Sequence, residues 1–191
     1  MKHHISSILG LSLLSTALSL TVCAQNSPSG YVDFGKLSPS TSGGEFVQVH
    51  INRNLIAMTA RLAQKQEPDI AELLGGLQAI QVNVIGLDEQ NRAEVEKQVK
   101  VIRGKLDAEG WEPVVAVQQK NEDVRVYIKT QGEESVQGLV VTILDGNKQA
   151  VLVNIVGDIK PEKVATIGER FNIDPLKEFK GKLHKAAPSE K

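Results

Sequence analysis

Few residues in this 191-residue chain have the type and spacing that catalysis or metal binding requires. Only His50 and His184 stand outside its first residues, and neither has a second His or Cys at the spacing of a zinc or copper site. No Ser lies in a nucleophile-elbow pattern that a histidine triad would use. We therefore expect no metal, no cofactor and no catalytic residue, and an enzyme is the less favoured class of protein.

Carboxylates keep one catalytic alternative open, because a fold can bring together side chains that are far apart in sequence. The four in question are Asp88, Glu112, Asp145 and Asp158. The segment Asp145-Gly146-Asn147 lacks the ligand series and closing Glu of a calcium loop and is typical of a hairpin turn. If the four carboxylates met in one pocket, the protein would be a periplasmic ligand-binding protein or a hydrolase.

A second group of residues is typical of a recognition surface rather than of catalysis. Arg125, Tyr127 and Lys129 alternate with apolar residues in one predicted strand, so their side chains share its polar face. Trp111 is the only tryptophan, and tryptophan is frequent in binding hot spots. The interpretations that we favour are more conservative: a solvated sheet face, and a tryptophan that covers the edge of a helix–sheet core.

Asp158 completes the candidate binding residues, because it follows Gly157 where a predicted buried strand opens into a helix. A carboxylate at such a position is well placed to contact a ligand or a partner. The favoured alternative is structural. In it, Asp158 caps the backbone N–H groups of the next helix and Gly157 supplies an unusual backbone angle.

The first 24 residues carry the clearest signal in the chain, a secretory signal peptide. Lys2 precedes an uncharged apolar stretch over residues 5–22, and Val22 and Ala24 are small residues at the positions that signal peptidase reads. Cleavage between Ala24 and Gln25 predicts a periplasmic or secreted protein. It also predicts no integral membrane span after processing.

Cys23 leaves a second outcome open, a lipid anchor. In a lipoprotein signal the cysteine becomes the lipidated first residue, but the β-branched Val22 before it fits the tight pocket of the lipoprotein peptidase poorly. We therefore favour soluble export over anchoring at Cys23. Because Cys23 is the only cysteine, cleavage after Ala24 leaves a chain without thiols.

The composition is that of one ordinary globular domain and excludes several partners. The chain has 22 Lys and Arg against 23 Asp and Glu, mixed along its length, so we expect no nucleic-acid partner. Aromatic residues make up 4% of the chain, too few for a platform that stacks sugars. We divide the chain into the signal peptide 1–24, a flexible lead-in 25–44, a domain 45–180 and a disordered tail 181–191.

Apolar periodicity predicts the elements of the first half of the domain. Tyr31–Phe34 in the lead-in is expected to dock as an edge strand, and residues 46–51 are expected to form a strand. A helix capped by Asn52 or Asn54 follows, and its expected apolar positions are Leu55, Met58, Ala60 and Leu62.

The clearest helix covers residues 88–110, after a short helix from Asp69 and a strand over residues 79–87. Asp88 is its expected N-cap. Its apolar stripe should face the core and consists of Val95, Val99, Ile102 and Leu106. The charged side chains between these positions, Arg103 among them, should face solvent.

From residue 111 onward, apolar runs alternate with turns, which predicts a four-strand meander followed by helices from Pro161 and Asp174. The expected fold class is therefore α+β. We expect a single domain with a mixed or antiparallel sheet, whose C-terminal four-strand meander packs against helices. The early strand–helix–strand unit is the part that can pair in parallel.

Four segments carry a family resemblance: residues 110–114, 124–129, 139–144 and 151–159. In this order they resemble the DUF4252 family of exported bacterial proteins. The resemblance implies no biochemical activity; many members look like lipoproteins, and some are associated with envelope regulation through extracytoplasmic sigma factors. We therefore expect an exported cell-envelope accessory or interaction domain without catalytic activity, with an envelope protein as its partner.

Overall fold

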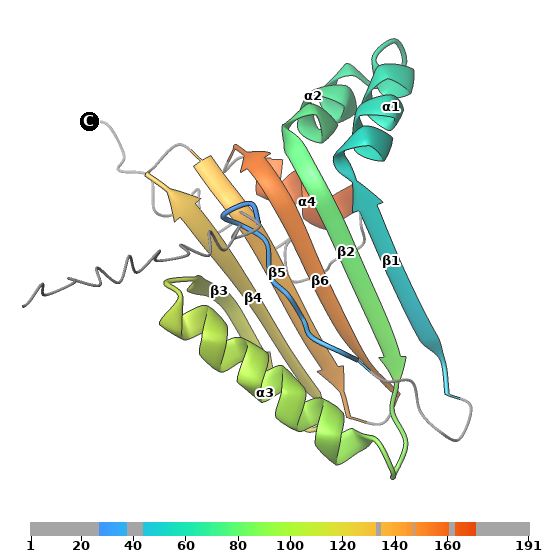
Figure 1. Cartoon of the computed structure of the whole chain (residues 1–191), viewed down its shortest axis with the longest axis vertical. Helices are drawn as coiled ribbons and strands as arrows, with labels where there is room; N and C mark the ends of the chain where they lie inside the picture. The colour runs from blue at the N-terminus through green and yellow to red at the C-terminus, as the bar shows by residue number, and fades with distance from the viewer. Residues whose placement is uncertain (1–26, 38–43, 133–134, 147, 161–162, 171–191) are drawn as a thin grey trace, which may run out of the picture.

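The computed structural model describes residues 27–37, 44–132, 135–146, 148–160 and 163–170 (Figure 1). The signal peptide with its cleavage site and Cys23, the tail 181–191 and the helix expected from Asp174 lie outside the described residues. Six strands form one sheet in the order β1-β2-β6-β5-β4-β3, and every neighbouring pair is antiparallel.

The strands are β1 (Phe46–Asn52), β2 (Leu77–Gly86), β3 (Glu112–Gln118), β4 (Glu122–Gln131), β5 (Ser135–Asp145) and β6 (Gln149–Ile159). The helices are α1 (Arg53–Ala63), α2 (Pro68–Gly76), α3 (Arg92–Ala108) and α4 (Val164–Arg170). The α+β fold class and the C-terminal meander of β3 to β6 are confirmed.

The first strands pair antiparallel, so of the two sheet types expected, mixed or antiparallel, the structure has the antiparallel one. β1 pairs with β2 from Phe46↔Ile85 to Asn52↔Ala79, and β2 pairs with β6 on its other side. Between β1 and β2 the chain forms α1 and α2, which pack against each other at one end of the sheet (Figure 1). The chain therefore re-enters the sheet from the end at which it left, and this makes the next strand antiparallel.

Both faces of the sheet bury apolar side chains. On one face, Ile80, Val126 and Ile155 belong to a core that includes residues of α1, α2 and α4. α3 lies across the opposite face (Figure 1), and there the structure buries the stripe that the sequence predicts: Val95, Val99, Ile102 and Leu106. Apolar burial on both faces of the sheet is the main stabilising contribution to such a domain.

Residues 27–37, which we call the strap, cross the α3 side of the sheet. The backbone N–H of Val32 donates to Asn154 Oδ1 at 3.0 Å, and Asn154 Nδ2 donates to the carbonyl of Gly30 at 3.0 Å. Val32 and Phe34 are buried in the α3 core. The expectation that Tyr31–Phe34 docks as an edge strand is wrong, because the strap binds across the face through a side-chain amide rather than through ladder hydrogen bonds.

α1 starts as predicted but presents a different face to the core. Asn52 Oδ1 accepts a hydrogen bond from the N–H of Leu55 at 3.1 Å, which confirms the predicted cap. Ile56 is the buried side chain of this helix, whereas Leu55, Met58 and Leu62 are 47%, 57% and 74% exposed. These three predicted apolar positions therefore face solvent, because α1 packs against the sheet through the side that carries Ile56.

Candidate functional site

Among the residues predicted as a recognition surface, two are buried in the α3 core: Tyr127 is fully buried and Trp111 is 3% exposed. The expectation of a solvated face is therefore wrong at Tyr127, whereas Arg125 and Lys129 are half-exposed. The favoured interpretation of Trp111 as the edge of the helix–sheet core is confirmed. Lys129 lies over the Trp111 ring at 5.8 Å, and its Nζ donates to the carbonyl of Glu109 at 3.3 Å.

The turn after α3 explains how Trp111 reaches this position. Gly110 has a φ of +77°, a left-handed conformation that glycine adopts without steric cost. The turn lets the N–H of Trp111 donate to the carbonyl of Leu106 at 3.0 Å. The chain then enters β3 with the indole directed into the core between α3 and the sheet.

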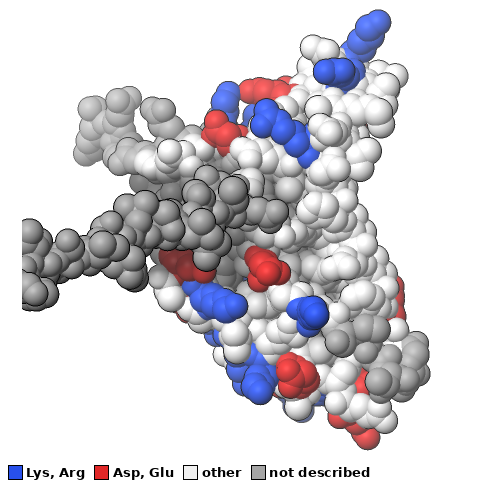
Figure 2. Space-filling view, in the orientation of Figure 1, with Lys and Arg blue, Asp and Glu red and all other residues white. Residues whose placement is uncertain are grey.

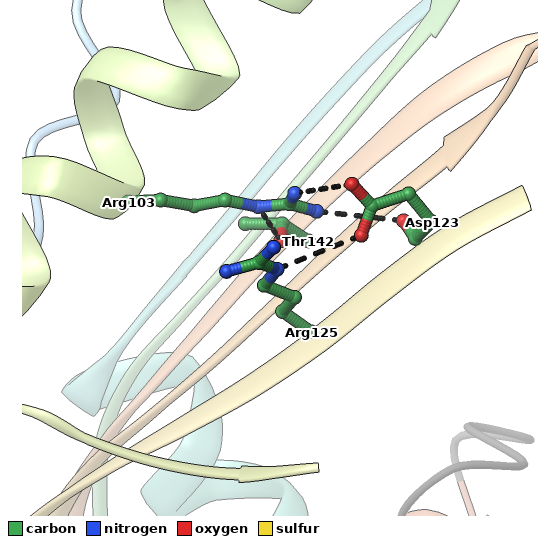
Figure 3. Close-up of polar contacts among 4 residues, drawn as sticks. All are labelled: Arg103, Asp123, Arg125 and Thr142. Atoms are coloured by element: carbon green, nitrogen blue, oxygen red, sulfur yellow. Dashed lines mark hydrogen bonds and ion pairs between the residues drawn. The ribbon is translucent and has the colours of Figure 1, made fainter. Parts of the chain in front are cut away.

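Figure 3 shows a polar cluster under α3 that the sequence did not reveal, centred on Arg103. Its Nε donates to Thr142 Oγ1 at 3.0 Å, its Nη1 to Asp123 Oδ2 at 2.7 Å and its Nη2 to the carbonyl of Asp123 at 3.4 Å. Arg103 is 6% exposed, so its expected solvent-facing position is wrong. With all three nitrogens donating, the guanidinium fastens α3 to β4 and β5 and is a structural link rather than a ligand site.

Arg125 extends this cluster toward the surface. Its Nε lies 3.6 Å from Asp123 Oδ1, and its side chain is 41% exposed (Figure 3). The neighbouring Tyr127 hydroxyl, and then the Asp123 charge, raise the pKa of Arg125 above its usual value, while burial opposes the rise. The Tyr127 hydroxyl nevertheless makes no hydrogen bond of good geometry with any described group. Two guanidinium groups and one carboxylate leave positive charge here, and both oxygens of the Asp123 carboxylate lie in ion pairs with these groups.

Asp158 lies inside β6 rather than at a helix start, so its predicted role as a helix cap is wrong. α4 begins at Val164, and the exposed Asp158 carboxylate accepts a hydrogen bond from Ser135 Oγ at 2.5 Å. Asp158 and Ser135 line a pocket of about 160 Å³ beside the strap. Gly157 is needed for close packing rather than for the predicted unusual backbone angle, because a Cβ there would lie 2.4 Å from the carbonyl oxygen of Gly76.

The four carboxylates of the catalytic alternative have separate neighbours. Asp88 Oδ1 accepts hydrogen bonds from the backbone of Gln90 and Asn91, and so caps the turn before α3 rather than the helix itself. Glu112 bonds Thr130, Asp145 pairs with Lys148, and Asp158 bonds Ser135. Among the described residues, no three His, Cys, Asp or Glu side chains lie close enough to hold a metal ion.

The outer edge of β1 is the feature that sequence analysis did not single out. The N–H of Gly86 donates to the carbonyl of Glu45 at 2.6 Å, which makes these two residues a hydrogen-bonded pair. Such pairs alternate along an antiparallel ladder, and the β1–β2 register continues without a bulge. The backbone groups of Val47, Val49 and Ile51 therefore face β2. Those of the alternate residues face away from the sheet: Phe46, Gln48, His50 and Asn52.

No strand of the described chain pairs with the outward groups of Phe46, Gln48 and His50, since β1 ends the sheet (Figure 1). The strand sequence, FVQVHIN, contains no Lys, Arg, Asp, Glu or Pro. Figure 2 shows charged side chains mixed over the region near α3, while the surface over β1 and β2 carries few. The lack of charge between residues 46 and 52 is visible in the sequence, but only the topology shows that this strand is at the edge.

This architecture defines an α+β domain in which an antiparallel sheet has helices on both faces and an open edge. The chain belongs to the DUF4252 family, described as a domain of unknown function, whose model matches residues 42–167. Neither a search of curated proteins nor one of solved structures finds a protein that matches this chain. No helix in the described residues is long and apolar enough to cross a membrane.

Proposed function

We propose that this protein is an exported, non-catalytic domain of the cell envelope that binds another polypeptide by strand addition at β1. The observation that carries the proposal is the open edge of β1, with outward backbone groups at Phe46, Gln48 and His50. An extended segment of an envelope protein would continue the sheet and satisfy these groups. Main-chain hydrogen bonds of this kind supply the affinity in β-augmentation complexes.

The side chains of β1 indicate what the added strand should look like. Val47 and Val49 lie on the same face as the core under α1 and α2, and each is 38% exposed. Gln48 and His50 lie on the opposite face and are exposed. A partner strand with apolar residues at alternate positions and polar residues between them would match both faces.

Amide hydrogen exchange tests the edge geometry in the isolated protein. We expect slow exchange at Val47 and Val49, whose N–H groups face β2, and fast exchange at Gln48 and His50, whose N–H groups face away. On partner binding, the amides of Gln48 and His50 should become protected while the others change little. Equal exchange rates at all four amides of the free protein would contradict the proposed edge.

A proline substitution tests the binding itself. Gln48→Pro removes one outward donor and leaves the β1–β2 ladder intact, because proline is compatible with an edge strand whose N–H faces solvent. Residues 25–191 of the wild type and of the matched control Gln48→Thr should capture the same envelope protein from an extract. Gln48→Pro should capture about tenfold less, a loss that corresponds to one to two main-chain hydrogen bonds. Equal capture by Gln48→Pro would refute strand addition.

The envelope location has its own measurement. Intact-mass analysis of the exported protein distinguishes a chain that starts at Gln25 from one that carries lipid on Cys23. We propose the free form, because Val22 is a poor residue before a lipidated cysteine. A lipid-modified Cys23 would replace free export by a tether, and an unprocessed chain retained in the cytoplasm would overturn the envelope assignment.

A further inference from the structure

Among the described residues, the large apolar side chains that are exposed lie on β1, α1 and α3, and α1 carries three of them. Leu55, Met58 and Leu62 are 47%, 57% and 74% exposed and recur at spacings of three and four residues. They therefore form one stripe along the side of α1 opposite the buried Ile56. The stripe is separate from the outward backbone groups of β1, since α1 packs with α2 at the end of the sheet (Figure 1).

Two cations lie near this stripe. α1 contains no acidic residue, Arg61 lies in its last turn, and Lys65 follows in the turn after the helix ends. Both cations are exposed. On a helical projection, Arg61 flanks the stripe on the Met58 side, whereas Arg53 projects from the opposite side of α1. An exposed apolar stripe bordered by cations is the pattern of a helix that lies in the interface of an anionic bilayer.

The strap reaches the domain at the same end of the sheet. Pro28, Ser29 and Gly30 line a pocket together with Gln78, the second residue of β2 after α2. The N-terminal end of the described chain therefore lies at the α1 end of the sheet.

We propose that α1 docks on an anionic phospholipid surface. Leu55, Met58 and Leu62 enter the headgroup region, while Arg61 and Lys65 contact lipid phosphates. The sheet then stands away from the bilayer with its β1 edge accessible at the side. The inference is independent of strand addition, because it uses α1 and not the backbone groups of β1.

Vesicle flotation with residues 25–191 tests the proposal. Vesicles of phosphatidylcholine with about one third phosphatidylglycerol should bind the wild type at least about tenfold better than vesicles of phosphatidylcholine alone, because each cation near the surface contributes about fivefold. Raising the salt concentration should weaken binding, since the attraction is screened within a Debye length. Equal binding to both vesicles, or no binding to either, would overturn the proposal.

Matched variants distinguish binding through α1 from non-specific hydrophobic binding. Met58→Asp and Leu62→Asp should each lower binding to the anionic vesicles about tenfold, and Arg61→Gln about fivefold. Val101→Asp is the control, because Val101 is also an exposed apolar residue, at 51%, but lies on α3. It should bind like the wild type. Unchanged thermal melting of all four variants shows that the fold is intact.

Two further outcomes decide between membranes and other occupants of the stripe. Gln48→Pro should bind vesicles like the wild type, so a failure of strand addition leaves this result untouched. If the wild type does not bind vesicles but forms a dimer in light scattering, and Met58→Asp is monomeric, the stripe contacts a second copy of the chain. That result would refute the lipid assignment.

Discussion

The two edges of the sheet differ in whether their sequence and register would hinder pairing with a further strand. β3 begins with Glu112 and Pro113, and its register with β4 shifts between Pro113 and Val115. Charge, proline and a bulge are the features by which natural sheets prevent unwanted pairing. β1 has none of these features between residues 46 and 52, and its register is regular throughout. The difference indicates that one edge is protected against association and the other is available for it.

The same contrast extends to the elements beside each edge. Next to β3 and β4, the cluster around Arg103 and the packing of Trp111 fasten α3 to the sheet. Next to β1, the outward side of α1 leaves apolar side chains in solvent. Substitutions near β3 and β4 should therefore affect stability, whereas those near β1 should affect binding.

The largest stability effect is expected at Asp123. Asp123→Ala leaves the buried guanidinium of Arg103 without its ionic partner, which should lower the free energy of unfolding by about 3–5 kcal/mol. Urea denaturation of the purified domain measures this loss. The matched control is Arg125→Gln, because Arg125 is 41% exposed and its ion pair spans 3.6 Å, so it should cost less than about 1 kcal/mol. Similar losses for both variants would contradict the structural role of Arg103.

A smaller loss is expected where the strap meets β5. A Cβ on Gly138 would lie 2.6 Å from Trp111 Cη2 and 2.7 Å from the Cα of Gly30, so Gly138→Ala should destabilise by about 1–3 kcal/mol. Gly75→Ala is the control on the β1 side of the molecule, because no atom lies within 4 Å of its added methyl group. It should be neutral or stabilise α2 by up to about 1 kcal/mol. The melting temperature should therefore fall for Gly138→Ala and stay level or rise for Gly75→Ala.

Sequence periodicity predicted the elements of this fold well, because each strand and helix is encoded locally. The stripe of α3, the cap at Asn52 and the meander from β3 to β6 all depend on neighbouring residues. The direction of the strands in the first half does not depend on neighbouring residues alone. It depends on the pairing of α1 with α2, which no local sequence pattern predicts.

The sequence also did not predict which side of a helix packs against the sheet. Leu55, Met58 and Leu62 form a regular apolar stripe and lie in solvent, whereas Arg103 carries a charge and is buried. Each outcome depends on a partner far away in the chain: Asp123 and Thr142 make burial of the guanidinium tolerable. The sequence therefore did not identify β1 and α1 as exposed surfaces, although it shows that neither element contains an acidic residue.

Substitutions on the exposed stripe should barely change stability, in contrast to those near β3. Met58→Ser and Leu62→Ser remove apolar side chains that are already 57% and 74% exposed, so each should alter the free energy of unfolding by less than about 0.5 kcal/mol. Ile56→Ser on the opposite side of α1 should cost several times more, because Ile56 is 2% exposed. If Met58→Ser or Leu62→Ser proved as costly as Ile56→Ser, the stripe would be covered within the chain.

The smallest effect is expected at an ion-pair cluster on the α2 side, and it should depend on pH. Glu72 lies 2.9 Å from Lys160 Nζ and 3.4 Å from Lys163 Nζ, and hydrogen bonds to these two lysines lower its pKa below the ordinary value of 4.5. A lowered carboxyl pKa contributes stability that is complete above the unfolded pKa and is lost as the pH falls through the folded pKa. Glu72→Gln should therefore be slightly less stable than the wild type in urea at neutral pH, and the difference should shrink as the pH falls below 4.5. A difference that stays constant as the pH falls would show that Glu72 acts through packing rather than through its charge.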